Sequence, residues 1–369
     1  PVGLLFSRVP KIQAKRGLFE TSCVSLKKAD REDDRVQREI EEGCGEFVDI
    51  GGLSLGEALG QIDSLGINIL IEMNGYTQHA RPELVAHSSA PLRISFLGFA
   101  HSLMSPFVDF MVTDSTATPT DLWRSPERAM LFPFTFYLTN HASSFHASHL
   151  SSPSSLPHVT KTQVGLREGS FVFASFNQPF KITPELFDVW MRILVLVPDS
   201  QLWLLKLNEG EEAEEHLRLR ARSLGVEDWR LFFTGSAALE DHIGYKSAAD
   251  LMLDGVVFNG HSTVADTLWA GVPVLTIAGT RMAARTCTSL LQGVHYGQGT
   301  MNHLTVARDL SDYQRIAVRL GLCPSCMSRL RRKLVHSRLS SPLFDTERWV
   351  GDWERGLKMA WEIRGGGGG

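Results

Sequence analysis

The segment "VVFNGHSTVADTLWAG", residues 256–271, combines residue types that can bind an anion at the start of a helix. An apolar run is followed by a glycine, by His261, Ser262 and Thr263, and then by a helical pattern. The first N–H groups of a helix lack intrahelical partners and carry partial positive charge, so this corner can bind a phosphate. Asp266, one turn further on, can accept a hydrogen bond from a sugar hydroxyl. In the alternative interpretation, Ser262 only caps the helix and His261 lies at the surface.

A second segment, "SFNQPFKI" at residues 175–182, also follows a predicted strand and places Gln178 and Lys181 at its carboxyl end. Because the carboxyl ends of parallel strands meet at one edge of a sheet, Lys181 can lie close to the helix start. Its ammonium would contact a diphosphate whose other oxygens accept from backbone N–H groups. Taken alone, Lys181 fits a solvated surface lysine. The two segments together predict a diphosphate site.

A third candidate is His242, in the helical segment "ALEDHIGYK". It precedes the apolar run "LMLDGVVF", which predicts a strand that ends at Asn259 and Gly260. A histidine at this position can stack on a nucleoside base or hydrogen-bond to it, or it can be a partly buried helix residue. The sequence leaves both interpretations open.

Several phosphate-binding and metal-binding motifs are absent from the sequence. There is no GxxxxGK[ST], and no GxGxxG opens a helix, which disfavours a P-loop phosphotransferase and a dinucleotide-dependent dehydrogenase. No DxD triplet supplies the carboxylate pair that would hold a divalent cation on a nucleotide diphosphate. We therefore predict no metal or other cofactor, and expect backbone amides and Lys181 to stabilise a departing diphosphate.

Composition limits the possible partners. The 369 residues carry a formal net charge of −4, which argues against binding to nucleic acid or to an anionic membrane through bulk charge. No apolar run is long enough to span a bilayer, and the first residues lack the apolar core of a signal peptide, so we expect a soluble intracellular protein. The five cysteines are few and scattered, which suits a reducing compartment better than a disulfide framework. Only "CPSC", Cys323 to Cys326, has metal or redox spacing, and its alternative is a helix start.

The order of apolar and helical patterns predicts an α/β fold. Strand-like runs such as "EFVDIGG", "INILIEMNG" and "VDFMVTD" alternate with helical ones in the first part, and the alternation restarts with "SFVFASFN". Two such halves in series predict two Rossmann-like lobes with a cleft between the carboxyl ends of their sheets. We expect a first lobe over residues 1–140, a Ser/His/Pro-rich linker over 141–169, a second lobe over 170–310, C-terminal helices over 311–363 and a glycine tail over 364–369. The histidines at 141, 146 and 149 fit a solvated linker better than a metal site.

Six segments in order resemble the catalytic region of the nucleocytoplasmic O-GlcNAc transferases, glycosyltransferase family 41, which are inverting enzymes of GT-B fold. The resemblance runs from about Leu18 to Ile363 and rests on "ILIEMNGYTQHARPEL", "APLRISFLGF", "VDFMVTD", "FNQPFKITPELFDVW", "NGHSTVADTLWAGVPVLT" and "SSPLFDTERW". It implies a UDP-GlcNAc donor, Ser or Thr hydroxyls of intracellular proteins as acceptors, no metal, and a cytoplasmic and nuclear location.

The resemblance also implies roles for individual residues. Lys181 and His261 would be the catalytic residues, because they would stabilise the departing diphosphate. The other implied contacts are Gln178, Ser262 and Thr263 to the diphosphate, Asp266 to the ribose, Ala237, Leu239, His242 and Tyr245 around the uridine, and Leu97 with Gly98 at the sugar.

The chain departs from the family pattern at several of these positions. Leu239 stands where the family has a lysine, and near Tyr245 the family has an arginine for which Lys246 would be an imperfect substitute. The loop "GFAHSLMS" replaces a small, polar loop. The family's "SDFxxH" segment, which carries a candidate general base, and its tetratricopeptide repeats have no counterpart, so we expect an incomplete first lobe. His79 and His101 are fallback candidates for a substitute base, but nothing in the sequence places either one beside an acceptor.

Two alternatives follow from these departures. One is an O-fucosyltransferase that uses GDP-fucose, against which His261 argues because that branch typically lacks it. The other is a nucleotide-binding pseudoenzyme without a catalytic base.

Overall fold

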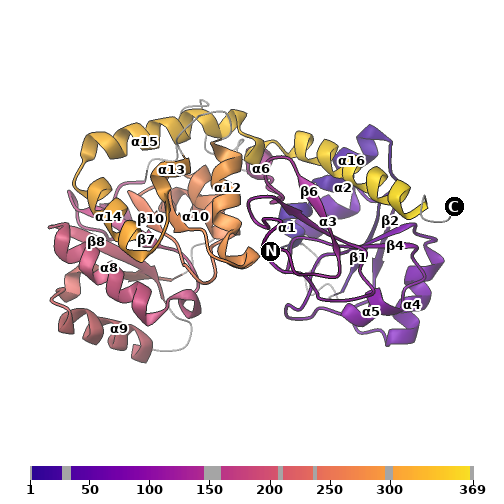
Figure 1. Cartoon of the computed structure of the whole chain (residues 1–369), viewed down its shortest axis with the longest axis horizontal. Coiled ribbons are helices and arrows are strands. Elements are labelled where there is room, and N and C mark those ends of the chain that lie inside the picture. The colour runs from indigo at the N-terminus through magenta and orange to yellow at the C-terminus, as the bar shows by residue number, and fades with distance from the viewer. Residues whose placement is uncertain are drawn as a thin grey trace. The chain divides into compact units, whose positions relative to one another are not determined.

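The computed structural model of the chain describes residues 2–26, 35–144, 159–206, 211–235, 239–295 and 302–365. The chain divides into two compact units (Figure 1). The first unit comprises Pro1–Asn140 and Pro342–Gly369, and the second comprises His141–Ser341. The expected C-terminal helices over 311–363 are thus divided between the units, and the segment expected as a linker begins the second unit.

The first unit is an α/β structure, and the strands in its described residues pair in parallel. Strands β3 to β6 form a four-stranded sheet in sequence order, while β1 and β2 form a separate pair. Its elements are α1 (Val2–Phe6), α2 (Val9–Arg16), β1 (Ser22–Ser25), α3 (Arg35–Glu41), β2 (Glu46–Asp49), α4 (Leu55–Ser64), β3 (Ile69–Glu72), α5 (Pro82–His87), β4 (Leu92–Ser95), β5 (Phe110–Asp114), β6 (Arg128–Phe132), η6 (Pro342–Phe344) and α16 (Thr346–Gly365).

The last helix, α16, belongs to the first unit because of its aromatic residues. Trp349 and Trp353 are one turn apart on α16, so they lie on the same helix face. Both rings contact Phe96 and Phe132 of the first unit, with centroid separations between 5.1 and 6.5 Å. Trp349 and Trp353 are 2% and 1% exposed, so this cluster forms part of the unit's core.

The described residues of the second unit form one parallel sheet in the order β12-β11-β10-β7-β8-β9. Its elements are α6 (His141–Ser144), η1 (Thr162–Val164), β7 (Phe171–Ser175), η2 (Pro179–Lys181), α8 (Pro184–Leu196), β8 (Ser200–Leu205), α9 (Glu211–Ser223), η3 (Asp228–Arg230), β9 (Leu231–Thr234), α10 (Leu239–Lys246), β10 (Leu251–Leu253), α11 (Ser262–Trp269), β11 (Val274–Ile277), η4 (Met282–Ala284), α12 (Thr286–Val294), α13 (Asn302–Thr305), β12 (Val306–Ala307), α14 (Leu310–Gly321), α15 (Pro324–Ser337) and η5 (Arg338–Ser340).

This strand order has a functional consequence. The chain starts at β7, adds β8 and β9 on one side, and then returns to add β10, β11 and β12 on the other. The direction of winding therefore reverses between β7 and β10. In such sheets a crevice opens beyond the carboxyl ends of the strands at this switch point, and ligands bind there. The segments that follow β7 and β10 contain Lys181 and His261, the two corners that the sequence predicts to form a diphosphate site.

Helix α8 shows how local sequence sets an element of this fold. Thr183 precedes it as the N-cap, and the Thr183 hydroxyl accepts a hydrogen bond from the N–H of Leu186. Proline occupies the first helical position, where no N–H is needed. One face of the helix is apolar and buried in the core of the second unit: Leu186, Val189, Trp190, Ile193 and Leu194.

Two expectations about the chain are wrong. The strand predicted over "LMLDGVVF" ends at Leu253, because Asp254 turns its side chain back to bind nearby N–H and O–H groups. The cysteines are not all unpaired: disulfides join Cys23 to Cys44 and Cys323 to Cys326. The first pair is 21 residues apart in sequence, but β1 and β2 pair side by side and bring the two Cα atoms to 6.1 Å.

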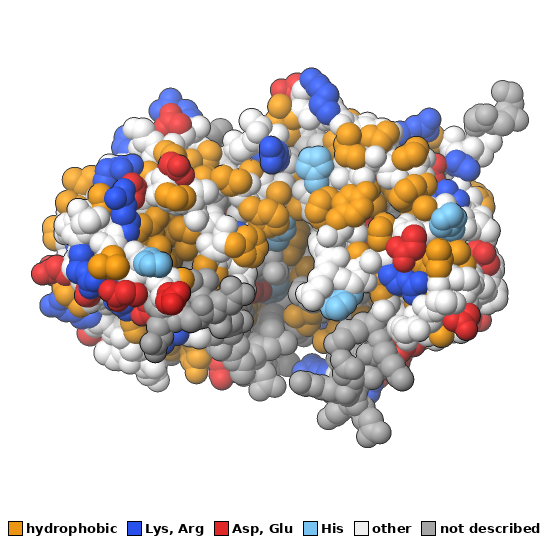
Figure 2. Space-filling model, turned by 90° about the horizontal axis from the view of Figure 1, so that it is seen from below, with side chains coloured by type: hydrophobic (Ala, Val, Ile, Leu, Met, Phe, Trp, Pro, Cys, Tyr) orange, Lys and Arg blue, Asp and Glu red, His pale blue; other side chains and the backbone are white. Residues whose placement is uncertain are grey.

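The surface is mixed in charge. On the face drawn in Figure 2, acidic and basic side chains are interspersed, in keeping with the small net charge. Among the helices of the described ranges, none combines the length and the apolar character that crossing a bilayer requires.

A pair of leucines on α8 tests the assignment of its buried face. Leu194 is 1% exposed and Leu196 is 49% exposed. Leu194→Ala should lower the free energy of unfolding by about 2–5 kcal/mol, because it leaves a cavity in the core. Leu196→Ala, a matched control, should change it by less than about 0.5 kcal/mol. Urea denaturation followed by circular dichroism measures both, and equal effects would contradict the assignment.

Candidate functional site

A buried carboxylate organises the switch point of the second unit. Asp254 directly follows β10 and is 0% exposed. Its Oδ1 accepts hydrogen bonds from the N–H of Gly260 at 2.7 Å and from Asn177 Nδ2 at 2.9 Å. Its Oδ2 accepts from the Thr276 hydroxyl at 3.0 Å. Burial raises the pKa of Asp254, and these hydrogen bonds act in the opposite direction. The carboxylate thus ties the ends of β7, β10 and β11 together.

Asn259, also 0% exposed, closes the loop between β10 and α11. Its Nδ2 donates to the Gly255 carbonyl at 2.6 Å, and its Oδ1 accepts from the N–H of Cys287 at 3.1 Å. These bonds satisfy both ends of a buried amide and anchor it to α12. The Asn259 carbonyl remains available, and it accepts from Lys181 Nζ at 2.9 Å.

The backbone at Gly260, just before α11, is packed so tightly that a side chain at this position would force its neighbours to shift. A Cβ atom there would lie 2.6 Å from Asn177 Oδ1 and 3.0 Å from Val264 Cγ2. The following residue, His261, is the N-cap but makes no side-chain capping bond. By helix geometry, the N–H groups of the first turn, which includes Ser262 and Thr263, have no intrahelical partner. Both residues are partly exposed, so the turn can donate to an anion.

Lys181 lies at this same corner, as the sequence predicts. It ends the 3₁₀ turn η2 after β7, and its Nζ also lies 4.0 Å from the centre of the Phe258 ring. Burial lowers the pKa of Lys181 to about 8, although the charge of Asp254 acts in the opposite direction. The ammonium is therefore charged near neutral pH, partly shielded from water, and able to bind an anion strongly.

His261 is neutral in this environment. Its ring stacks on Phe258, with centroids 5.1 Å apart and planes 23° apart. Part of the residue is exposed, but Nε2 is screened from solvent. Burial, and to a smaller extent the charge of Lys181, lower the pKa of His261 to about 3. A hydrogen bond with the Ala283 backbone acts in the opposite direction. The positive charge of this corner therefore resides on Lys181.

Asp266, the residue expected to accept from a ribose, is held by two buried side chains. Its Oδ2 accepts from Lys246 Nζ at 2.8 Å, and its Oδ1 lies 2.9 Å from His141 Nε2. Lys246 and His141 have side chains only 3% exposed, whereas that of Asp266 is 19% exposed. Burial lowers the pKa of Lys246, and Asp266 opposes this. The carboxylate is thus fixed in orientation with one edge open to solvent.

This arrangement corrects one expectation. His141 is not part of a solvated linker, because it is buried against Trp269 and bonded to Asp266. The ammonium of Lys246, the expected imperfect substitute for an arginine, is turned inward to Asp266. The histidines at 146 and 149 lie outside the described residues.

The remaining candidates of the second unit are less constrained. Gln178 is exposed at the start of η2, where its carbonyl accepts from the N–H of Lys181. Tyr245 is 39% exposed on α10. Leu239 and His242 lie on the same helix, of which the structure describes only the backbone at these two positions, and Ala237 lies outside the described residues.

The sugar-side candidates lie in the first unit, after β4. Leu97 is 7% exposed and has a positive φ of 72°. Gly98 approaches the end of β3 so closely that a Cβ atom would lie 2.0 Å from the Met73 carbonyl oxygen. At the end of β3, Glu72 accepts from the N–H groups of Asn74 and Gly75, and burial raises the pKa of this carboxyl. Both substitute bases are exposed: His79, at a positive φ of 66°, and His101.

Sequence reasoning missed the residues that support the site. Asp254, Asn177, Asn259 and Phe258 all lie within or beside the two motifs, but their roles depend on contacts between strands. One signal was present: an Asp that directly follows a buried strand is costly unless it is hydrogen-bonded.

A parallel sheet in this order, with a cationic corner at its switch point, gives the second unit a Rossmann type of α/β fold. The family model "Glycosyl transferase family 41" matches residues 1–154 and 146–353. The chain therefore belongs to glycosyl transferase family 41.

Relatives support this assignment. The chain is 33% identical over 347 residues to the probable UDP-N-acetylglucosamine–peptide N-acetylglucosaminyltransferase SEC of Arabidopsis thaliana. The matched region covers 93% of this chain and 34% of the relative. It is 27% identical to the corresponding Caenorhabditis elegans transferase, with 98% of this chain and 40% of that protein covered. The chain thus spans about a third of the length of these relatives.

Solved structures share the fold. An O-GlcNAc transferase from Thermobaculum terrenum superposes with a TM-score of 0.83 at 24% identity, covering 99% of this chain and 65% of that one. The Anabaena protein HepE, solved with UDP and glucose, superposes with a TM-score of 0.58 at 12% identity, covering 97% of this chain and 96% of that one. The chain therefore has the GT-B type of α/β fold that these glycosyltransferases share.

The contact of Asp266 with Lys246 can be tested by a double-mutant cycle. Asp266→Asn should destabilise the protein by about 3–5 kcal/mol, because it leaves the buried Lys246 ammonium without its carboxylate. Lys246→Met should cost less, and the double variant should resemble Lys246→Met alone. The coupling should exceed about 1 kcal/mol in urea denaturation.

As a control, Asp188→Asn removes a surface ion pair with Arg220 in the same unit and should have a much smaller effect. Additive effects of the Asp266 and Lys246 changes would show that the two side chains do not interact.

Proposed function

We propose that this chain is the catalytic region of an inverting protein O-GlcNAc transferase. It would transfer N-acetylglucosamine from UDP-GlcNAc to Ser or Thr hydroxyls of intracellular proteins, in the cytoplasm and nucleus. The observation that carries the proposal is the contact between Lys181 and the Asn259 carbonyl at 2.9 Å, which places an ammonium beside the start of α11. Family membership and the names of the relatives support the choice of donor and acceptor.

The diphosphate of the donor would bind at this corner. First-turn N–H groups and the hydroxyls of Ser262 and Thr263 would donate to phosphate oxygens, and Lys181 would supply the charge. Gln178, exposed on the same turn as Lys181, would add a further donor. Asp266 would accept from the ribose hydroxyls through its solvent-exposed edge, held in place by Lys246 and His141.

The nucleoside would extend from the ribose toward α10. The backbone near Ala237 and the residues Leu239, His242 and Tyr245 would surround the uracil. Leu97 and Gly98 would line the sugar site, where the close approach of Gly98 to β3 fixes the backbone.

The reaction would be a single displacement. An acceptor hydroxyl oxygen attacks C1 of the sugar, the bond from C1 to the diphosphate oxygen breaks, and the configuration at C1 inverts. The leaving UDP takes the electron pair, and the acceptor proton goes to a base. Preorganised donors at a developing negative charge contribute about 3–4 kcal/mol each in other enzymes. Lys181 and the start of α11 would supply this stabilisation without a metal ion, with neutral His261 lining the corner.

A transfer assay with labelled donors tests this proposal. With a Ser/Thr-containing acceptor peptide, UDP-GlcNAc should give a product sensitive to a β-N-acetylglucosaminidase, in the presence of a chelator. Transfer from GDP-fucose instead would assign the chain to O-fucosyl transfer. UDP binding with neither transfer nor donor hydrolysis would make it a pseudoenzyme.

The role of Lys181 can be measured by calorimetry with UDP. Lys181→Met should weaken binding roughly tenfold to hundredfold, because it removes a charge-assisted hydrogen bond. Lys333→Met, which changes an exposed lysine on α15 of the same unit, should leave the affinity unchanged. Equal affinity of the Lys181 variant and the wild type would remove the main support for the site.

The pKa of Lys181 predicts a pH dependence of binding. In the free protein this pKa is about 8, and a bound diphosphate would raise it, so the affinity for UDP is greatest below pH 8. As the pH rises through 8, the free lysine loses its proton and the affinity should fall. Titrations between pH 7 and 9.5 should show this decline in the wild type but not in Lys181→Met.

A further inference from the structure

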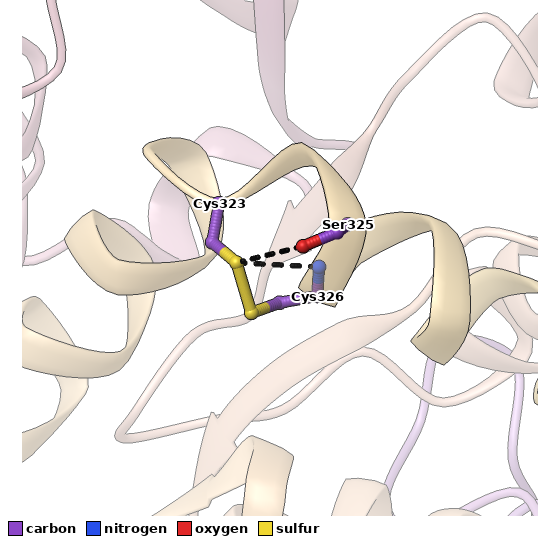
Figure 3. The surroundings of a disulfide bond; sticks show 3 residues. All are labelled: Cys323, Ser325 and Cys326. Atoms are coloured by element: carbon purple, nitrogen blue, oxygen red, sulfur yellow. Dashed lines mark hydrogen bonds between the residues drawn. A yellow bond between two sulfur atoms is a disulfide. The ribbon is translucent and has the colours of Figure 1, made fainter.

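The turn between α14 and α15 contains a disulfide that the proposed reaction does not use. It joins Cys323, the N-cap of α15, to Cys326 in the first turn of that helix (Figure 3). The neighbours in the chain, Leu322, Pro324 and Ser325, are exposed, so the bond lies at the surface of the second unit.

The two sulfur atoms differ in their surroundings. Cys323 Sγ accepts a hydrogen bond from the N–H of Cys326 at 3.3 Å and lies 3.5 Å from the Ser325 hydroxyl (Figure 3). It also lies at the positive end of a 14-residue helix. Cys326, in contrast, packs against the hydrophobic core of the unit. The Cys326 N–H, the Ser325 hydroxyl and the helix N-terminus all favour the thiolate form of Cys323. A first cysteine stabilised as a thiolate at a helix start is typical of reactive Cys-x-x-Cys pairs.

This disulfide contributes little to holding the fold together. It closes a loop with a sequence separation of 3, whereas Cys23–Cys44 closes one of 21 and joins β1 to the segment just before β2. A disulfide lowers the conformational entropy of the unfolded chain, and this effect grows with the length of the loop that it closes. Cys323–Cys326 therefore stabilises the folded state less than Cys23–Cys44 does. Helix α15 is anchored separately: Arg331 donates to the carbonyls of Ser247 and Ala249. Opening the bond therefore leaves the helix in place.

We propose that Cys323–Cys326 is a reversible thiol–disulfide exchange site whose co-reactant is a small thiol and its disulfide. The thiolate of the small thiol attacks Cys323 Sγ, the bond between the two cysteines breaks, and Cys326 leaves as a thiolate that takes a proton from water. A second small thiolate attacks the outer sulfur of the mixed disulfide, and Cys323 leaves as a thiolate stabilised by the N–H of Cys326. In sum, the protein disulfide is reduced to two thiols while two small thiols are oxidised to one disulfide.

The test uses the full chain equilibrated in buffers of reduced and oxidised glutathione. Free thiols are trapped with an alkylating reagent, and peptide mass spectrometry counts them separately at each cysteine. The peptide with Cys323 and Cys326 should convert between disulfide and dithiol as the glutathione ratio changes, and should convert back when the ratio is reversed. Cys287→Ser removes the buried free cysteine and should leave this transition unchanged.

Single variants test the asymmetry of the pair. The Cys323 thiol in Cys326→Ser should be alkylated at least about tenfold faster at pH 7 than the Cys326 thiol in Cys323→Ser. Serine is a good N-cap, so Cys323→Ser keeps the start of α15, which circular dichroism checks. A pair that stays oxidised, or stays reduced, at every glutathione ratio would overturn the proposal, as would equal alkylation rates. Neither result depends on whether the chain binds UDP.

Discussion

The candidate site depends on one buried carboxylate. Moving Asp254 out of water is costly, and the cost is offset only because its oxygens accept from Gly260, Asn177 and Thr276. Those three residues lie at the start of α11, at the end of β7 and in β11. A single group therefore sets the helix start and the turn with Lys181 in a fixed relation, so the donors are oriented before any ligand arrives.

The charge of the site is concentrated on one residue. Lys181 lies between the Asn259 carbonyl and the Phe258 ring, while His261 stays neutral because it is buried beside that ammonium. Asp266 is negative, but Lys246 balances it from the side away from solvent. The corner thus presents an ammonium and, one helical turn away, a carboxylate, which is the polarity that the proposed binding of a nucleoside diphosphate requires.

Local signals in the sequence predict most elements of the second unit. The period and the cap of α8 identify its buried face, and the apolar runs identify β7 and β8. The same reasoning places Lys181 and the start of α11 at strand ends. Their proximity, however, depends on β7 and β10 being neighbours in the sheet, and hydrophobic periodicity carries no information about strand order. The environment of His141 is likewise not predictable from local sequence, because in a Ser- and Pro-rich segment nothing local reveals that its partner is Asp266, 125 residues away.

The first unit is built from two chain segments that are separated in sequence by the whole second unit. Hydrogen bonds join these two segments. The Thr139 hydroxyl donates to the Leu343 carbonyl, and Trp349 Nε1 donates to the Phe136 carbonyl, across 204 and 213 residues. During translation, the amino-terminal strands therefore leave the ribosome long before the tryptophans that cover them. Until α16 emerges, Phe96 and Phe132 lack those rings, so the nascent first unit exposes apolar surface that favours aggregation. The second unit, in contrast, is continuous and can fold while synthesis is still under way.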